Sequence, residues 1–167
     1  SEFIDKLTLL EEAESGWATA SGMSAVFTTF AGLLNAGEHI VACKSVFGST
    51  HKLFTEILPK WQISHTYVPY NDYEGFEKAI QKNTKLLYIE TPSNPGLDIL
   101  DLEKIATICK RHDIIFVVDN CFATPIIQQP IRYGAYIVIH SATKYIDGQG
   151  RTLGGAILGK ADIISKI

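Results

Sequence analysis

Short apolar runs alternate along this chain with longer segments in which apolar residues recur every three or four positions. The runs predict buried strands, the longer segments predict amphipathic helices, and their alternation is typical of parallel strands joined by crossover helices. Strands are predicted at residues 39–43, 63–68, 85–89, 114–118 and 136–139, with two others at 16–20 and 154–159. Helices are predicted at residues 4–13, 23–34, 50–58, 73–81 and 102–111, with another beginning at Ala161. We therefore expect one α/β domain over residues 1–167, with a mostly parallel, mixed sheet and helices on both faces.

The composition is that of an ordinary globular protein. Of the 167 residues, 46% are hydrophobic and 20% are charged, with 15 Lys and Arg against 18 Asp and Glu. A net charge of -3 provides no basic surface, so we expect no nucleic-acid partner. The apolar runs are far shorter than the roughly 18 to 20 residues that span a bilayer, so we expect no membrane partner either.

Cysteine usage and the N-terminus favour a cytoplasmic protein. Cys43, Cys109 and Cys121 are odd in number and widely spaced, which argues against a disulfide framework and against a zinc site. Acidic residues stand near the start, where an export signal would have a basic and then an apolar stretch. Because the chain starts with Ser1 rather than Met and stops within a predicted helix, we expect it to be part of a longer protein.

Polar groups follow four of the predicted strands, at the edge where open α/β sheets bind ligands. They are Ser21-Gly22-Met23, residues 90–95, Asp119-Asn120 and Ser141-Ala142-Thr143-Lys144. Lys144 is flanked by hydroxyls and followed by glycines, an environment in which a lysine can be desolvated and form imines. Taken alone, a lysine at such a position is more often an ordinary surface residue.

Asp119 ends the apolar run 114–118, so its carboxylate is expected where a buried strand opens to the crevice. A charge there needs a partner, such as a metal, a helix N-terminus, a hydroxyl or the protonated ring nitrogen of a pyridine cofactor. Capping of the following turn is an equally simple role. Ser21-Gly22-Met23 precedes an apolar helix whose N-terminal amides would point toward an anion, although a serine N-cap is also common for local reasons.

Two other patterns do not indicate a site. The glycines at 148, 150 and 154 have the spacing GxGxxxG and follow a polar loop, which argues against a dinucleotide-binding fingerprint. The five histidines share no spacing typical of metal ligands, so no metal is expected.

The four motifs together resemble the Cys/Met-metabolism family of fold type I pyridoxal phosphate (PLP) enzymes. The quoted residues are Ser21-Gly22-Met23, Glu90-Thr91-Pro92-Ser93-Asn94-Pro95, Val118-Asp119-Asn120 and His140-Ser141-Ala142-Thr143-Lys144. The resemblance runs through the whole chain and implies that residues 1–167 are a fragment of the PLP-binding large domain of this fold, without the N-terminal segment and the C-terminal domain of the family. It also implies that PLP is the cofactor and that the substrate is a small amino acid.

The resemblance assigns roles to individual residues. It implies that Lys144 holds the cofactor through an imine and then moves protons on the substrate. Asp119 matches the acid that keeps the pyridine nitrogen protonated.

The same resemblance implies a cradle for the cofactor phosphate and a support for its ring. The amides of Gly22 and Met23, next to Ser21, match this cradle together with the hydroxyls of Ser141 and Thr143. Asn94 matches a residue near the phenolic oxygen of the cofactor, and Glu90 matches a support of that loop.

One position departs from many relatives. The lyases and cystathionine synthases have a tyrosine stacked over the pyridine ring, where this chain has Phe47. Stacking is retained, but a catalytic role that needs the phenol is in doubt. Phe47 and the segment after Lys144 are most similar to the O-succinylhomoserine sulfhydrylase branch. Cys121 stands where relatives have Thr or Val, and a small buried filler is its simpler role.

The resemblance therefore implies γ-replacement, in which sulfide replaces the acyloxy group at Cγ of O-succinylhomoserine or O-acetylhomoserine to give homocysteine. Family members are more than twice this long and share their active sites between subunits, so a homodimer or homotetramer is expected. Cystathionine γ-synthase and γ-lyase activities stay open, as does an inactive assembly domain. A cofactor-free lysine aldolase is disfavoured because it leaves Asp119 without a role.

Overall fold

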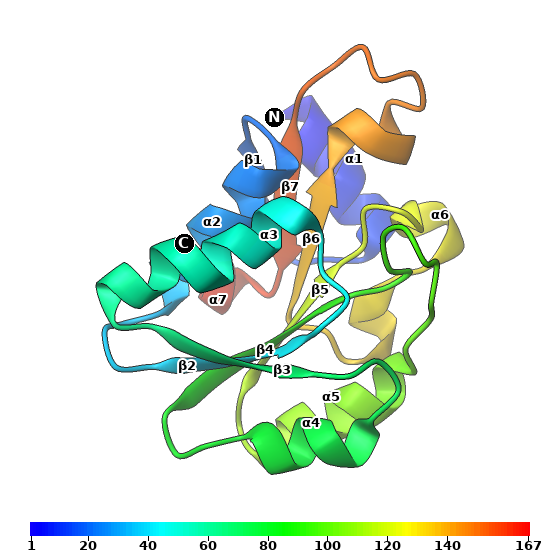
Figure 1. Ribbon diagram of the computed structural model, residues 1–167. Coiled ribbons are helices and arrows are strands. Elements are labelled where there is room, and N and C mark those ends of the chain that lie inside the picture. Colours follow the sequence, from blue (N-terminus) through cyan, green and yellow to red (C-terminus); the bar gives the residue numbers. More distant parts are fainter.

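The computed structural model describes residues 1–167, which fold around one seven-stranded sheet (Figure 1). The strands are β1 (Ser15–Thr19), β2 (His39–Cys43), β3 (Ser64–Val68), β4 (Thr84–Glu90), β5 (Ile115–Asp119), β6 (Ile137–Ser141) and β7 (Gly155–Gly159). Their order is β1-β7-β6-β5-β4-β2-β3. Strands β2 to β6 are parallel, whereas β7 runs antiparallel to both β1 and β6. The mixed, mostly parallel sheet that the sequence predicts is therefore confirmed.

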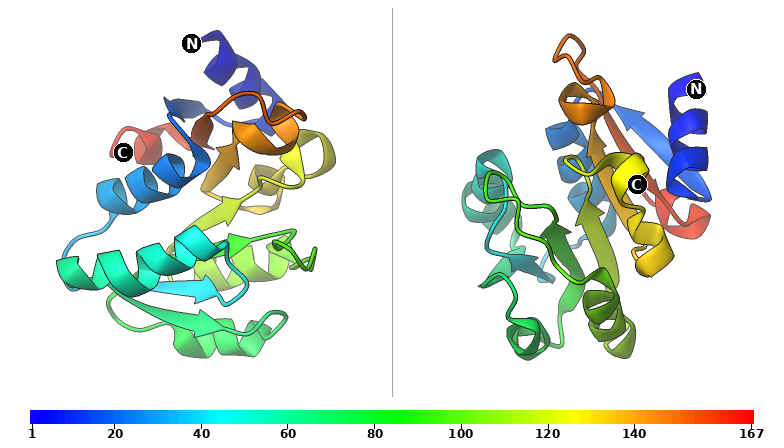
Figure 2. Two further views of the ribbon diagram at one scale, coloured as in Figure 1. Left: turned by 45° about the horizontal axis from the view of Figure 1, so that its top comes forward. Right: turned by 90° about the vertical axis from the view of Figure 1, so that its right-hand side faces the viewer.

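Helices cover both faces of the sheet (Figure 2). They are α1 (Glu2–Glu11), α2 (Gly22–Leu33), α3 (Gly48–Lys52), α4 (Tyr73–Ala79), α5 (Leu102–Arg111), α6 (Thr124–Ile127) and α7 (Ala161–Ile164). Short π-helical turns, η1 (Leu53–Ile57) and η4 (Ala142–Ile146), and 3-10 turns, η2 (Leu58–Trp61) and η3 (Pro130–Tyr133), complete the chain. Helices α2 and α7 pack on one face, while α4 and α5 pack on the other. Helix α1 covers β7 on the face away from α2.

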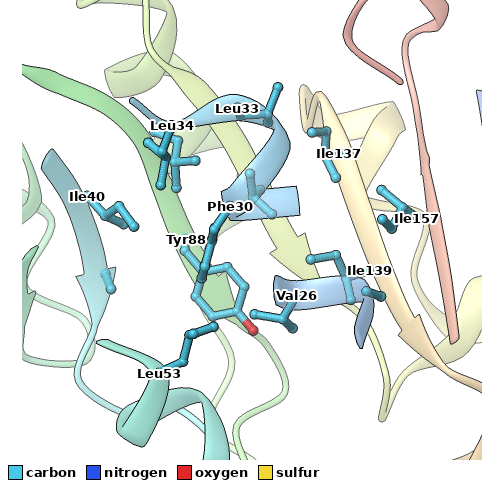
Figure 3. Packing of buried hydrophobic residues seen from close by; sticks show 14 of the residues in the cluster. Val26, Phe30, Leu33, Leu34, Ile40, Leu53, Tyr88, Ile137, Ile139 and Ile157 are labelled. Atoms are coloured by element: carbon cyan, nitrogen blue, oxygen red, sulfur yellow. The ribbon is translucent and has the colours of Figure 1, made fainter. Parts of the chain in front are cut away.

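The sheet separates two apolar clusters, of 19 and 16 buried residues. Neighbouring residues of one strand alternate between them: Val117 belongs to the first cluster and Val118 to the second. Both are fully buried, as expected for parallel strands covered on both faces. Figure 3 shows the first cluster, in which Phe30 of α2 lies close to Tyr88 of β4.

The helix predicted at residues 50–58 differs from the structure. It begins two residues earlier, as α3, and then continues through the π turn η1 and the 3-10 turn η2 to Trp61. Pro59 stands at the start of η2, and its missing N–H removes one hydrogen bond of a regular helix. None of the helices has both the length and the apolar character needed to cross a membrane.

We predict that Phe30→Ala lowers the free energy of unfolding by about 3 to 5 kcal/mol, because it opens a cavity in the first cluster. Phe30 is fully buried, and its ring centroid lies 5.4 Å from that of Phe54 and 5.5 Å from that of Tyr88. The matched control is Phe27→Ala on the same helix, where the side chain is 39% exposed and contacts the edge of Trp61. It should cost about 1 kcal/mol or less. Equal losses in chemical denaturation would contradict this packing.

Candidate functional site

Three parallel strands end at the same edge of the sheet. Strand β4 ends at Glu90, β5 at Asp119 and β6 at Ser141, and Glu90 is paired in register with Asp119. The carboxyl ends of parallel strands are where open α/β sheets bind ligands. The chain thus brings together residues that are more than 50 positions apart in the sequence.

A cavity of about 80 Å³ lies at this edge. It is lined by Gly22, Met23, Val26, Phe47, Thr50, Glu90, Asn94, Asp119, Cys121, Phe122, Ser141 and Lys144. Phe47 and Lys144 are both exposed, so a ligand held here would reach from the cavity to the surface.

Asp119 is 8% exposed, and its carboxylate has two hydrogen bonds. Its Oδ1 accepts the backbone N–H of Cys121 at 3.1 Å, and its Oδ2 accepts the hydroxyl of Tyr88 at 3.1 Å. Burial raises the pKa of Asp119, while the bonds from Cys121 and Tyr88 and the charge of His140 act in the opposite direction. One oxygen thus caps the following turn, while the residue as a whole lines the cavity.

Glu90 is a second buried acid in the same cavity. Its Oε2 accepts the backbone N–H of Phe47 at 2.9 Å, which ties the loop after β2 to the end of β4. Burial, and next the charge of Asp119, raise the pKa of Glu90 to about 8, while the amides of Phe47 and Asn94 and the charge of Lys144 oppose this shift. Burial and the neighbouring charge of Asp119 therefore favour the neutral form of Glu90, in which it repels Asp119 less.

Lys144 lies in η4, one turn beyond the end of β6. Its backbone dihedral angles, φ -82° and ψ -125°, are not helical, so the turn is kinked at this residue. The Nζ atom lies 5.6 Å from the centroid of the Phe47 ring. The side chain is exposed, whereas the sequence reasoning considered a desolvated lysine. Lys144 nevertheless lines the same cavity as Asp119.

The N-terminus of α2 faces this cavity. Ser21 is the N-cap: its Oγ accepts the N–H of Ser24 at 3.1 Å, and its backbone oxygen accepts that of Ala25. The N–H groups of Gly22 and Met23 have no acceptor within the chain. Such free amides at the start of a 12-residue helix form a natural anion site.

Gly22 is required here by close packing. A Cβ atom added to it would lie 2.6 Å from the Cβ of Ser141 and 3.0 Å from its Oγ. The helix therefore approaches the end of β6 more closely than any side chain would allow. This approach places the free amides beside the Ser141 hydroxyl.

The cavity contains most, though not all, of the residues singled out from the sequence. Those in the lining are Gly22, Met23, Phe47, Glu90, Asn94, Asp119, Ser141 and Lys144. Ser21 lies beside the cavity as the N-cap of α2, and the half-buried Thr143 is not in the lining.

Sequence reasoning missed Tyr88, whose hydroxyl binds Asp119. In the sequence, Tyr88 is indistinguishable from the core residues of an apolar strand, and in the structure its ring is fully buried. The alternation of side chains along a strand could have indicated Tyr88, because it lies two positions before Glu90 and therefore on the same face of β4. Val26, Thr50 and Phe122 also line the cavity. Thr50 and Phe122 stand in segments that the sequence comparison with the family includes, but no role was predicted for them, and no local pattern marks Val26.

A larger hollow, of about 640 Å³, lies elsewhere, between the start of α5 and α6. Ile99, Ile126 and Ile127 line it, and all three are strongly exposed. It has no lysine and no buried acid among its lining residues, so the smaller cavity is the better candidate for chemistry.

Comparisons with known proteins agree with this geometry. The family model described as Cys/Met metabolism PLP-dependent enzyme matches residues 1–167. An O-succinylhomoserine sulfhydrylase of Pseudomonas aeruginosa is 43% identical over 165 residues, which cover 99% of this chain and 41% of the relative. A cystathionine gamma-lyase of Bacillus subtilis is 45% identical over 152 residues, which cover 91% of this chain and 40% of the relative.

A solved structure from Campylobacter jejuni that carries N'-pyridoxyl-lysine-5'-monophosphate superimposes with a TM-score of 0.93 at 34% identity. The match covers 98% of this chain and 40% of that one. The chain thus spans about two fifths of the length of the curated relatives that it matches. A family match over every residue, together with this fold and these identities, shows that the chain belongs to the Cys/Met-metabolism family of PLP-dependent enzymes.

Proposed function

We propose that this chain is the cofactor-binding domain of a homoserine-ester sulfhydrylase. The reaction replaces the acyloxy group at Cγ of O-succinylhomoserine, or of O-acetylhomoserine, with sulfide: the Cγ–O bond breaks, a Cγ–S bond forms, and homocysteine and succinate or acetate result. The observation that carries the proposal is that Lys144 and Asp119 line one cavity, with the Phe47 ring beside the lysine.

The residues of the cavity fit PLP. The cofactor has an aldehyde, a basic ring nitrogen and a phosphate, and the cavity offers an amine, a buried acid and the free amides of a helix N-terminus. Lys144 would hold the aldehyde carbon, Asp119 would face the ring nitrogen, and Gly22, Met23 and Ser141 would hold the phosphate. The close packing at Gly22 supports this assignment, because it keeps the amides uncovered.

When bound, PLP draws electrons away from Cα of the amino acid, provided that its ring nitrogen stays protonated. The carboxylate of Asp119 would hold that proton at the ring nitrogen. Burial alone favours the neutral acid, so the hydrogen bonds from Tyr88 and Cys121 are needed to favour the charged form.

Proton movement would depend on Lys144. Phe47 has no hydroxyl, so it orients a ring by stacking but cannot accept or donate a proton. The Nζ atom of Lys144 is the one amine in the cavity lining, and it would take the proton from Cα and return it farther along the side chain. Glu90 would support this arrangement by holding the Phe47 backbone through a hydrogen bond of 2.9 Å.

The proposal includes assembly of the intact protein into a homodimer or homotetramer with shared active sites. Apolar side chains on α1 and α6 support it, because Leu9, Ile126 and Ile127 are 79%, 78% and 81% exposed. Apolar residues gathered on a surface are typical of subunit contacts.

A γ-lyase is the second candidate, because the cystathionine gamma-lyase of Bacillus subtilis is as similar to this chain as the sulfhydrylase of Pseudomonas aeruginosa. The two reactions share the cofactor and the proton transfers, and they differ in whether a thiol enters. Phe47 favours the sulfhydrylase, since the resemblance described above implies a tyrosine at this position in the lyases and places Phe47 with the sulfhydrylase branch.

We predict that PLP becomes attached to Lys144 when the intact protein is incubated with it and treated with borohydride. Peptide mass spectrometry should locate the adduct, and Lys144→Ala should abolish it. The matched control is Lys160→Ala, since the Nζ of Lys160 also lies over an aromatic ring, 4.6 Å from the centroid of Tyr136. An undiminished adduct in Lys144→Ala protein, or none in the wild type, would refute the cofactor site and favour a domain that serves assembly alone.

Gly22→Ala should weaken PLP binding about tenfold to a hundredfold, since inserting a methyl group into a tightly packed site costs about 1 to 3 kcal/mol. Gly48→Ala is the control, because an added Cβ there meets no atom within 4 Å. Titration of the protein with PLP, followed by the change in absorbance, measures both. Similar dissociation constants for the two variants would argue against a cradle at the start of α2.

The intact protein, supplied with O-succinylhomoserine and sulfide, should form homocysteine and succinate in equal amounts. Parallel reactions contain cysteine in place of sulfide, or no thiol. Faster formation of cystathionine with cysteine would contradict a sulfhydrylase and indicate a cystathionine synthase. Faster formation of ammonia and an oxo acid without a thiol would indicate a lyase. Chromatography with mass detection distinguishes the products.

A further inference from the structure

A side-chain network outside the cavity joins the ends of β4 and β5. Gln128 is the residue after α6, and its Nε2 donates to the backbone oxygen of Thr91 at 3.0 Å and to the Oδ1 of Asn120 at 2.9 Å. The Nδ2 of Asn120 donates in return to the backbone oxygen of Gln128 at 2.8 Å. Thr91 directly follows β4 and Asn120 directly follows β5, so one glutamine holds both strand ends. Figure 1 shows α6 close to the segment that leads from β4 to α5.

Main-chain oxygens fix the direction of these hydrogen bonds. A carbonyl oxygen accepts and cannot donate, so the Gln128 side-chain nitrogen must face Thr91 and the Asn120 side-chain nitrogen must face Gln128. Exchanging oxygen and nitrogen in either amide would place two acceptors against each other. Thr91 and Asn120 are both 0% exposed, so water cannot replace a lost partner, and a buried polar group without a partner is costly.

Asn120 is the fixed end of this network. Its backbone N–H donates to the oxygen of Ile139 in β6 at 2.9 Å, and it directly follows Asp119. The sequence marks Asp119 and Asn120 together as polar residues after a buried strand, but the cavity lining contains Asp119 and not Asn120. Asn120 therefore has a contact to the next loop in place of a contact to the cavity.

The loop that begins at Thr91 carries Asn94 into the lining of the cavity. The Oγ of Ser93 donates to the Oδ2 of Asp98 at 3.1 Å, so the loop is closed on itself. The hydroxyl of Tyr70 bonds to the backbone oxygen of Asp98 and lies 3.3 Å from the Oγ1 of Thr91. These contacts hold the loop together, whereas the glutamine after α6 attaches its first residue to the turn after β5.

We propose that Gln128 is a positioning residue of the cofactor site: it holds Thr91 against Asn120 and thereby keeps Asn94 at the cavity. The inference rests on the proposed function, in which the cavity holds PLP. The side-chain amide of Asn94 can donate a hydrogen bond, and the phenolic oxygen of PLP can accept one. Gln128 itself touches neither PLP nor the substrate, since it does not line the cavity.

The decisive variant is Gln128→Met, because methionine has nearly the length of glutamine but no N–H group to donate. Gln128→Glu is a second variant, which keeps the shape of the side chain and replaces the donating nitrogen by an oxygen. The matched control is Gln129→Met at the next position. Gln129 is also half-buried and also donates its Nε2 to a backbone oxygen, but this oxygen belongs to Leu10 of α1, outside the network.

The measurement is a titration of the intact protein with PLP, which gives the dissociation constant and the absorption spectrum of the bound cofactor. Gln128→Met and Gln128→Glu should each weaken binding roughly threefold to tenfold, the usual effect of losing one hydrogen bond. Both should also change the spectrum in the same way as Asn94→Ala, which removes the donor itself. Gln129→Met should keep the dissociation constant and the spectrum of the wild type.

A double variant tests whether the effect passes through Asn94. In Asn94→Ala protein, the further change Gln128→Met should weaken binding no more, because the group that Gln128 positions is already gone. Melting temperatures recorded in parallel measure the contribution of the network to stability, which should be lost in either background.

Wild-type affinity and spectrum in both Gln128 variants overturn the inference and leave the proposed function intact. Additive losses of affinity in the double variant overturn it as well, and so does failure of both Gln128 variants to fold, because the role of Gln128 is then structural. A wild-type protein that binds no PLP overturns the proposed function and the inference with it. Weaker binding with the spectrum of Asn94→Ala, and no further loss in the double variant, supports the positioning role.

Discussion

The carboxylate of Asp119 lies almost wholly out of water, at the end of a strand whose other residues are apolar. Burying a charge is expensive unless other groups compensate for it. The compensation comes from separate elements: the Tyr88 hydroxyl of β4, the amide of the turn after β5, and the charge of His140 on β6. The position of one acid therefore depends on the order of three neighbouring strands, and in the proposed function this acid would face the ring nitrogen of the cofactor.

The same strand order determines where the other residues of the cavity lie. Because β4, β5 and β6 are parallel, the residues that follow them share one edge of the sheet. Strand β7 begins at Gly155, beside Ser141, and runs antiparallel to β6 and β1, so that it carries the chain away from this edge after the loop that follows η4. Helix α2 then approaches Ser141 through Gly22, so that free amides, a buried acid and an amine surround one small volume.

Local sequence signals predict the strands and the strand ends well. Buried parallel strands have apolar runs such as 114–118, and the polar residue that interrupts such a run marks its end, which is how Asp119 could be recognised. The four motifs in order made the family recognisable as well, and the comparisons confirm it. The splitting of the helix near Pro59 was not predicted, because a π turn has no distinct residue pattern.

Contacts between distant residues could not be predicted in this way. Gln128 and Thr91 are joined by a hydrogen bond although they are separated by 37 positions, and neither belongs to a motif that names the other. Tyr88 resembles a core residue until the face of its strand is known. The exposure of Lys144 also follows from the tertiary arrangement, since it depends on which elements cover the mouth of the cavity and not on the neighbours of the lysine in sequence.

The central claim is that Asp119 and Lys144 serve the same bound molecule from opposite ends. PLP labelled with ¹⁵N at its ring nitrogen, bound to the intact protein, tests it directly by nitrogen NMR. A protonated ring nitrogen in the wild type, and an unprotonated one in Asp119→Asn protein that still binds the cofactor, is the predicted result. The same nitrogen signal in both proteins would contradict it.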